Sequence, residues 1–310
     1  MSTPDAVLLD VTRGELVESR HVGRFVLLEA DGSTAVSVGD VEAPVYARSS
    51  LKPLQAVAML ASGFDGPDEW IAMASASHNA EDVHRRTAAA ILASAGLDES
   101  ALQCPPALPR EQDEMLAWVR AGHGPARLCH NCSGKHSAKL ATCVAAGWDT
   151  ASYLSPDHPL QVAIVAHIER LGGAPIAATS VDGCGAPAHA LPLTALARSF
   201  AAIATAEPGS VEGRVAAAMR AHPHLVGGTG RAVTELMTEV GGVGGLVAKD
   251  GAEAVWAAAL PDGRAFASKT VDGTPRTLGP LLAAALAYWG FDGPAVRRWS
   301  SVAMLGGGRP

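Results

Sequence analysis

The chain has 310 residues, of which 48% are hydrophobic and 18% charged, so it can bury a large core and is neither disordered nor collagen-like. Its formal net charge of -7, with no run of Lys or Arg, argues against nucleic acid as a partner. The longest apolar stretch, Leu281 to Trp289, is too short to span a membrane. The first residues show no basic leader or cleavage site, so we expect a cytoplasmic protein whose five cysteines stay reduced.

Strand-like patterns occupy both ends of the chain, and helical patterns fill the middle. Residues 6–40 and 245–273 each resemble a meander of short antiparallel strands, and Asp-Gly pairs at Asp250, Asp262 and Asp272 mark the expected turns of the second. Apolar spacing, caps and prolines predict helices at 54–61, 88–95, 132–146, 161–171 after a cap at 155–157, and 280–289.

Strands at both ends around a helical insertion predict one antiparallel sheet built from both ends and covered by helices, an α+β fold. We find no linker, repeat or break in composition that would mark a boundary. We therefore expect a single catalytic domain over residues 1–310, with a helical subregion at 80–225.

Lysine is scarce, with five residues among 24 basic ones, and Lys52 follows Ser49 by three positions at an expected helix start. That spacing places both side chains on one face, where a neutral amine could take the hydroxyl proton during attack on a carbonyl. The same Ser-x-x-Lys arrangement occurs in penicillin-recognising enzymes. The alternative is a helix-capping serine beside a solvated lysine.

Two later fragments follow in the order of the penicillin-recognising set. Ser77-His78-Asn79 corresponds to its Ser-x-Asn, and Lys269-Thr270 to its Lys-Thr-Gly, although Val271 replaces the glycine. Order and strand context together favour serine acyl-transfer chemistry.

A cysteine cluster could hold a metal. Cys129 and Cys132 have redox-motif spacing, Lys135 lies one helical turn after Cys132, and Cys184 could complete a site across the fold. Buried, unreactive cysteines are the alternative. Asp182, which precedes Gly183, is either a turn residue or a group that binds a substrate ammonium.

Taken together, these motifs resemble the bacterial L-asparaginase II family, the inducible, thermolabile type. The resemblance rests on segments along most of the chain: 12–14, 17–21, 48–53, 77–79, 132–136, 182–185, 222–223, 227–231 and 269–273. The segments Cys132-Ser133-Gly134-Lys135-His136 and Asp182-Gly183-Cys184-Gly185 are the most specific of them. Such a resemblance implies a fold like that of serine β-lactamases and glutaminases, and hydrolysis of L-asparagine to L-aspartate and ammonia.

The resemblance also implies roles for individual residues. Ser49 with Lys52, and Ser77 with Lys269, match two Ser-Lys pairs. Cys132, Lys135 and Cys184 match the family's Zn²⁺ ligands, and the zinc would aid substrate binding more than it would activate water. Arg48, His136 and Asp182 match residues that shape the substrate pocket, where Arg48 would hold the carboxylate and Asp182 the ammonium.

These residues predict an acyl-enzyme mechanism with Ser49 as nucleophile, Lys52 as base, and Ser77 and Lys269 shuttling protons or polarising the amide. We expect a homodimer that acts on a small molecule. Three alternatives stay open: a glutaminase, which differs by one methylene in its substrate; a β-lactamase or transpeptidase; and a non-enzymatic zinc or redox protein that uses Cys129 and Cys132.

Overall fold

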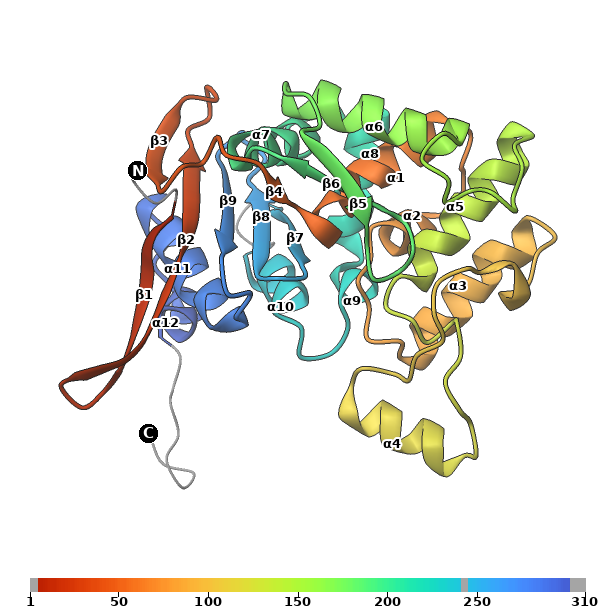
Figure 1. Ribbon diagram of the computed structural model, residues 1–310, viewed down its shortest axis with the longest axis horizontal. Helices are drawn as coiled ribbons and strands as arrows, with labels where there is room; N and C mark the ends of the chain where they lie inside the picture. The colour runs from red at the N-terminus through yellow and green to blue at the C-terminus, as the bar shows by residue number, and fades with distance from the viewer. Residues whose placement is uncertain (1–4, 241–244, 302–310) are drawn as a thin grey trace.

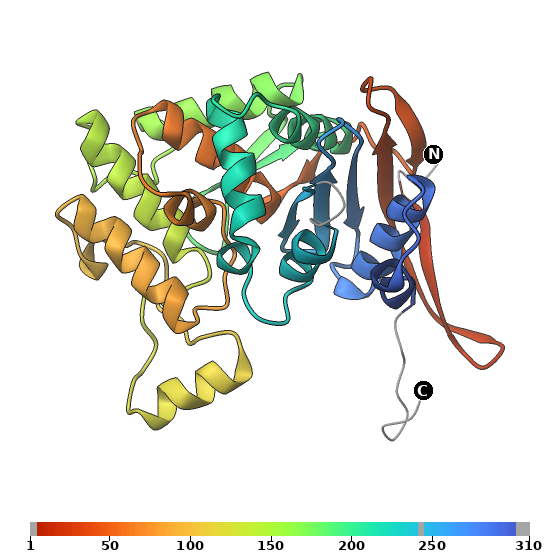
Figure 2. The ribbon, with the colours of Figure 1, turned by 180° about the vertical axis from the view of Figure 1, so that it is seen from behind.

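The computed structural model describes residues 5–240 and 245–301 (Figures 1 and 2). Strands from both ends of the chain form one antiparallel sheet. Its order is β1 (Ala6–Arg13), β2 (Leu16–Leu28), β9 (Ala265–Thr270), β8 (Val255–Ala259) and β7 (Val247–Gly251), and β3 (Thr34–Val38) also pairs with β2. The predicted α+β fold, with a sheet built from both ends, is confirmed.

The sheet is buried where helices cover it. Helix α7 (Leu193–Ala204) packs against β2, β8 and β9, while α10 (Ala232–Glu239) packs against β7. All five residues of β8 are buried, three of them alanines, so this strand shows no alternation of polar and apolar residues. Small side chains there let the helices approach the sheet closely.

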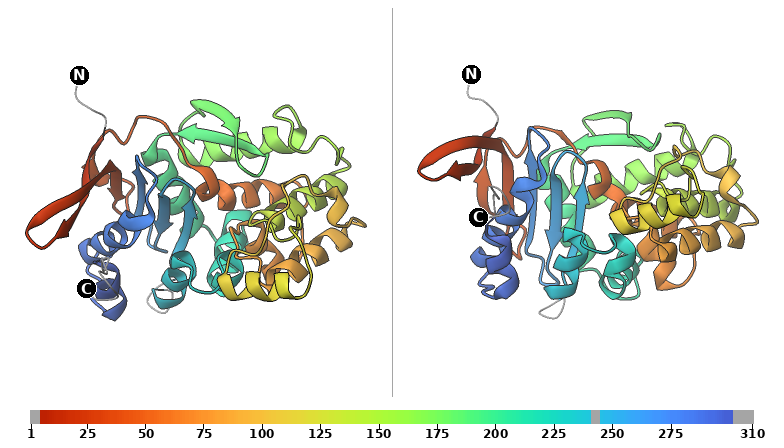
Figure 3. Two further views of the ribbon diagram at one scale, coloured as in Figure 1. Left: turned by 60° about the horizontal axis from the view of Figure 1, so that its bottom comes forward. Right: turned by 90° about the horizontal axis from the view of Figure 1, so that it is seen from below.

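Helices fill the other end of the molecule (Figure 3). They are α1 (Lys52–Ala61), α2 (Asp68–Ala74), α3 (Asp82–Ser94), α4 (Gln112–Arg120), α5 (Ser133–Ala146), α6 (Pro159–Gly172), α8 (Val211–Ala221) and α9 (Pro223–Val226), with 3-10 turns η1 (Arg48–Leu51) and η2 (Glu99–Ala101). Two helices after the last strand, α11 (Leu278–Tyr288) and α12 (Pro294–Trp299), follow the 3-10 turn η4 (Pro275–Thr277) and lie at the sheet end (Figures 1 and 2). Helix α1 is central: residues 52–60 are all buried, and it packs against α2, α5, α6 and α8. The described residues contain no helix with the length and apolarity needed to cross a membrane.

Several element boundaries differ from the sequence prediction. Helix α1 begins at Lys52, because the 3-10 turn η1 occupies the preceding four residues. The cap of α6 is His158, whose side chain accepts from the Leu160 amide, instead of the predicted 155–157 segment. Asp250-Gly251 ends strand β7 and forms no turn of its own.

A second, small sheet was not predicted. It contains β4 (Val45–Tyr46), β6 (Pro187–Leu191) and β5 (Ala178–Val181), in that order. Its strands are only two to five residues long, which is too short for an alternating pattern to stand out in the sequence. The sheet carries η1 after β4 and Asp182 after β5, and so brings two distant segments together.

Candidate active site

The turn η1 joins the small sheet to helix α1 and carries Ser49. It begins at Arg48, which has a positive φ of 52°, a strained conformation for a residue with a side chain. Pro53 occupies the first turn of α1, where its missing N–H needs no helical partner. Ser49 and Lys52 therefore lie at the same end of a buried helix, next to the edge strand β7.

Strand β7 reaches η1 because residue 251 is glycine. A Cβ atom at Gly251 would lie 2.7 Å from the Ala47 carbonyl oxygen and 3.0 Å from Ser50 Oγ. Ser50 Oγ also donates to the Lys249 carbonyl oxygen at 3.3 Å. Glycine thus allows the backbone of β7 to lie directly against the turn that carries Ser49.

Lys52 is 1% exposed and its amine contacts three groups. Its Nζ lies 2.9 Å from Ser77 Oγ and 3.2 Å from Cys132 Sγ, and it donates to the Ala76 carbonyl oxygen. Burial lowers the pKa of Lys52; the Lys135 charge acts in the same direction and Cys132 opposes it. The structure therefore brings together three predicted residues, Lys52, Ser77 and Cys132.

Ser77 lies in an extended segment that follows α2. The Ser77 amide donates to Val226 O at 2.9 Å, the His78 amide to Asn131 O at 3.1 Å, and the Asn79 amide to Gly227 O at 3.0 Å. These backbone bonds hold the segment between the end of α9 and the loop before α5. Ser77 is consequently positioned by backbone on both sides.

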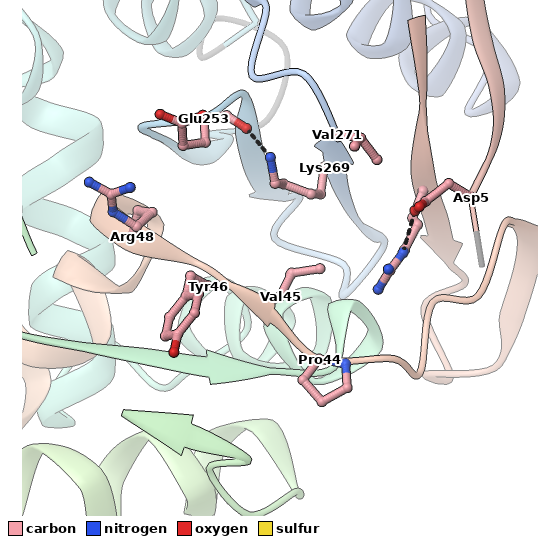
Figure 4. A pocket seen from close by; sticks show the side chains of 9 residues that line it. Asp5, Pro44, Val45, Tyr46, Arg48, Glu253, Lys269 and Val271 are labelled. Atoms are coloured by element: carbon pink, nitrogen blue, oxygen red, sulfur yellow. Dashed lines mark hydrogen bonds and ion pairs between the residues drawn. The ribbon is translucent and has the colours of Figure 1, made fainter. Parts of the chain in front are cut away.

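Lys269 does not meet Ser77. Its amine donates to the carbonyl oxygens of Glu253 and Thr270, and in the described part of the chain it forms no hydrogen bond with a serine. It lines a separate cavity of about 330 Å³ beside Arg48 and Tyr46 (Figure 4). The physical reason is sheet order, because β9 lies between β2 and β8, whereas η1 packs against β7 and β8.

Sequence reasoning missed a lysine that does border the turn. Lys249 on β7 is completely buried, and its amine contacts the carboxylate of Asp250, which also pairs with Arg231 at 2.6 Å. Burial lowers the pKa of Lys249 to about 8, although the charge of Asp250 opposes this. Lys249-Asp250-Gly251 keeps the glycine of Lys-Thr-Gly that Lys269-Thr270-Val271 lacks, and this was the available signal.

The residues predicted to bind the substrate, Arg48, Asp182 and His136, make contacts of a different kind. Arg48 donates through Nε and Nη2 to one oxygen of Asp182, at 2.9 Å and 2.7 Å. His136 Nδ1 lies 2.7 Å from the Tyr153 hydroxyl, and burial lowers the pKa of His136 to about 3, so its ring is neutral at pH 7. Arg48 and Asp182 thus neutralise each other in this structure.

The three predicted zinc ligands meet at the start of α5. Lys135 Nζ lies 3.1 Å from Cys184 Sγ, while Cys132 Sγ accepts from Lys52 Nζ at 3.2 Å and donates to Asn131 Oδ1 at 3.6 Å. Burial tends to lower the pKa of Lys135, but the sulfurs of Cys184 and Cys132 outweigh it and raise that pKa, which favours the charged amine beside them. All five cysteines are buried and free.

Two sulfurs and one amine suit zinc as a donor set. Ligands bound at about 2.0 to 2.3 Å in a tetrahedron lie roughly 3.3 to 3.8 Å apart, so the 3.1 Å contact needs only a small adjustment. Apart from this set, which depends on a lysine, the described residues contain no group of three or more His, Cys, Asp or Glu that could hold a metal.

An open cleft of about 410 Å³ connects the serines. Ser49 and Ser77 both line it, together with Arg110, Asn131, Arg231, Ala232, Asp250, Gly251, Ala252, Glu253, Ala254, Trp256, Gly273, Pro275 and Leu278. Two serine hydroxyls and the guanidinium groups of Arg110 and Arg231 therefore line a space large enough for a small molecule, and the buried amine of Lys52 contacts one of these serines, Ser77.

Comparisons with solved structures give only distant matches. A crystal structure of Mglu in its native form is 15% identical over 88% of this chain and 66% of that chain, with a TM-score of 0.46. Mglu in its tris and glutamate form is 16% identical over 92% and 63%, with a TM-score of 0.45. The chain thus spans slightly less than two thirds of the length of these proteins.

Sequence comparison is more specific. No curated protein sequence matches significantly. The family model described as L-asparaginase II, however, matches residues 9–309, which is nearly the whole chain and includes every predicted site residue. The chain therefore belongs to the L-asparaginase II family.

Proposed function

We propose that the protein is an amidohydrolase that converts L-asparagine to L-aspartate and ammonia. One observation carries the proposal: the buried amine of Lys52 lies 2.9 Å from Ser77 Oγ, one turn along the chain from Ser49, and both serines line the same cleft. A partly desolvated lysine beside two hydroxyls is suited to proton transfer during acyl transfer.

In the first step, Ser49 Oγ attacks the side-chain amide carbon of the substrate and its proton passes to neutral Lys52. Burial favours the neutral amine, because the charged form is the one that loses solvation. A neutral amine has only two hydrogens to donate, so in one of its three contacts the partner must donate a hydrogen to the amine. Ser77 can reverse its contact by donating its hydroxyl hydrogen, whereas the Ala76 carbonyl oxygen can only accept.

Ser77 then provides a path for the proton to the leaving group. Lys52 returns its proton through the Ser77 hydroxyl to the amide nitrogen, the C–N bond breaks, and ammonia leaves an ester on Ser49. Water next attacks the ester carbon, Lys52 takes its proton, and Ser49 leaves as a hydroxyl with aspartate released. The charge of Lys52 lowers the pKa of Lys249, and because two like charges repel each other, an ammonium at Lys249 would in turn favour the neutral form of Lys52.

The amino end of the substrate would bind Asp182. Its Oδ1 accepts from Arg48 and from the Gly183 amide, while its Oδ2 accepts no hydrogen bond from the described residues. The Arg48 contact holds this carboxylate in place and leaves one oxygen for an ammonium. His136, neutral and fixed by Tyr153, would form part of the neighbouring wall.

Zinc would be held by Cys132, Lys135 and Cys184. Bound there, the metal would supply a positive centre that aids substrate binding, and Lys135 would have to lose its proton to coordinate it. The contact between Cys132 and Lys52 links this group of residues to the catalytic amine.

Ammonia release by the purified protein from asparagine, compared with glutamine and with nitrocefin turnover, tests the proposal. We expect release from asparagine and its loss, by at least about 1,000-fold, in Ser49→Ala. The folded state should persist, because Ser49 provides no side-chain cap for the helix. Rapid quench and mass spectrometry should locate an aspartyl adduct on Ser49. Release from glutamine alone, or nitrocefin turnover, would overturn the asparaginase proposal.

A further inference from the structure

The cleft contains two guanidinium groups, and they differ in their hydrogen bonding. Arg231 donates to Asp250 Oδ2 at 2.6 Å, to Ser77 O at 3.3 Å and to Asn79 Oδ1 at 3.4 Å. Arg110 also lines the cleft, but its guanidinium has no hydrogen-bond acceptor among the residues that the structure describes. Arg110 is exposed, so its guanidinium N–H donors are open to solvent and to an anion that enters the cleft.

The backbone of Arg110 is nevertheless fixed. Its amide donates to Asn79 O at 2.8 Å, two residues from Ser77. The arm that follows, α4, is attached to α3 by Arg85, which pairs with Glu114 at 3.2 Å and lies over the Trp118 ring at 4.6 Å. Arg110 is therefore at the attached base of the arm, with a defined place beside the reacting serines.

The charges around Arg110 leave it without a counter-ion. Asp250 is already shared between Lys249 and Arg231, so it has no full charge to offer a further cation. Partial burial, followed by the nearby charge of Arg231, lowers the pKa of Arg110. An anion that entered the cleft would relieve this excess of positive charge.

We propose that Arg110 binds the α-carboxylate of the amino-acid substrate, a role that the sequence suggested for Arg48. The inference rests on the proposed function and names the residue that recognises its substrate. A planar guanidinium fork matches the two oxygens of a carboxylate. Arg48 is already engaged with Asp182. Only two carbon atoms separate the carboxylate of asparagine from its amide, so a receptor fixed two residues from Ser77 suits a short substrate.

The test compares asparagine with β-alaninamide, which is the same molecule without its α-carboxylate. In Arg110→Ala, kcat/KM for asparagine should fall about 100-fold, while kcat/KM for β-alaninamide should change by less than about threefold. Arg110→Lys should fall between the parent and the alanine variant, since it keeps the charge and loses the fork. Arg120→Ala, an exposed arginine on α4, is the matched control and should behave like the parent.

Arg48→Ala is the decisive comparison. The proposal is overturned if kcat/KM falls for asparagine but not for β-alaninamide in Arg48→Ala. It is also overturned if kcat/KM falls equally for both substrates in Arg110→Ala. Calorimetry with L-aspartate and β-alanine makes the same comparison without turnover: Arg110→Ala should weaken aspartate binding alone. A parent that binds aspartate through Arg110 but releases no ammonia would contradict the proposed function and leave this inference standing.

Discussion

Two lysines on strands of the same sheet have very different surroundings. Lys249 on β7 is completely buried, contacts Asp250 and lies on the strand that borders η1. Lys269 on β9 is only partly buried, donates to backbone carbonyls and lines the separate cavity of Figure 4. Burial and proximity to Lys52 therefore favour Lys249 as the lysine that influences the chemistry.

The difference shows what the order of motifs along a chain can and cannot predict. Three strands follow one another as antiparallel neighbours, so the last of them, β9, joins β2 and the first, β7, is left at the edge beside the helices. Only a glycine after the lysine allows that edge to contact η1, and this glycine is Gly251. The spacing between lysine and glycine in Lys249-Asp250-Gly251 therefore indicated the right lysine better than the order of the motifs along the chain did.

Replacing each lysine in turn gives the largest expected contrast. Lys249→Gln should reduce kcat about 100-fold, because the charge near Lys52 is lost and Asp250 keeps a single cationic partner. Lys269→Gln should change kcat by less than about threefold, given that its amine contacts backbone carbonyl oxygens and does not line the cleft that holds the serines. Steady-state ammonia release measures both, and the reverse order of effects would restore the pairing of Ser77 with Lys269.

The pH dependence sharpens the role of Lys249. Because its pKa is about 8, its ammonium and the activity that depends on it should decline as pH rises through about 8. In Lys249→Arg the guanidinium stays charged, so this alkaline decline should move upward. The unfolded chain holds the Lys249 proton up to about pH 10.5, so the free energy of unfolding should rise with pH between about 8 and 10.5, relative to Lys249→Gln. Identical profiles in parent and Arg variant would contradict the role.

A substitution at Gly251 tests the approach of β7 to η1. Gly251→Ala places a methyl group against Ala47 O and Ser50 Oγ, so the strand must move away from Ser49. We expect a loss of about tenfold in kcat and of about 1 to 3 kcal/mol in the free energy of unfolding. Gly124→Ala, where no atom lies within 4 Å of the new methyl group, is the control. Equal behaviour of the two variants would mean that β7 tolerates the shift.

The smallest expected effect concerns zinc at Cys132, Lys135 and Cys184, of which Cys132 contacts Lys52. Dialysis against a chelator should weaken asparagine binding severalfold and change turnover less, with affinity for zinc falling at lower pH as Lys135 and the thiols regain protons. Cys184→Ser should reduce the zinc content measured by elemental analysis. Fully active protein that contains no zinc near neutral pH would leave these residues as buried packing groups.

The contacts of Lys52 with Ser77 and Cys132 were not predicted, because the sequence motifs paired Ser77 with Lys269 and placed Cys132 in a zinc site. The sequence did predict the strands at both ends, the main helices, and Ser49 close to Lys52 at a helix start. These features depend on local patterns, such as Pro53 at a helix start. The small sheet and the Arg48–Asp182 pair were not predictable in the same way, because they arise from contacts between distant segments. A role for Arg110 was not predicted either, since an isolated arginine in a loop belongs to no motif.

Pairing of the two chain ends has a consequence for biosynthesis. Gly23 pairs with Thr270 and Leu28 with Ala265, so β2 cannot complete its place in the sheet until residues 265–270 have left the ribosome. The edge strand that closes against Ser49 also comes late. Nascent chains should accordingly remain inactive until strands β7 to β9 have emerged, and the slow closure of such distant segments would set the pace of maturation.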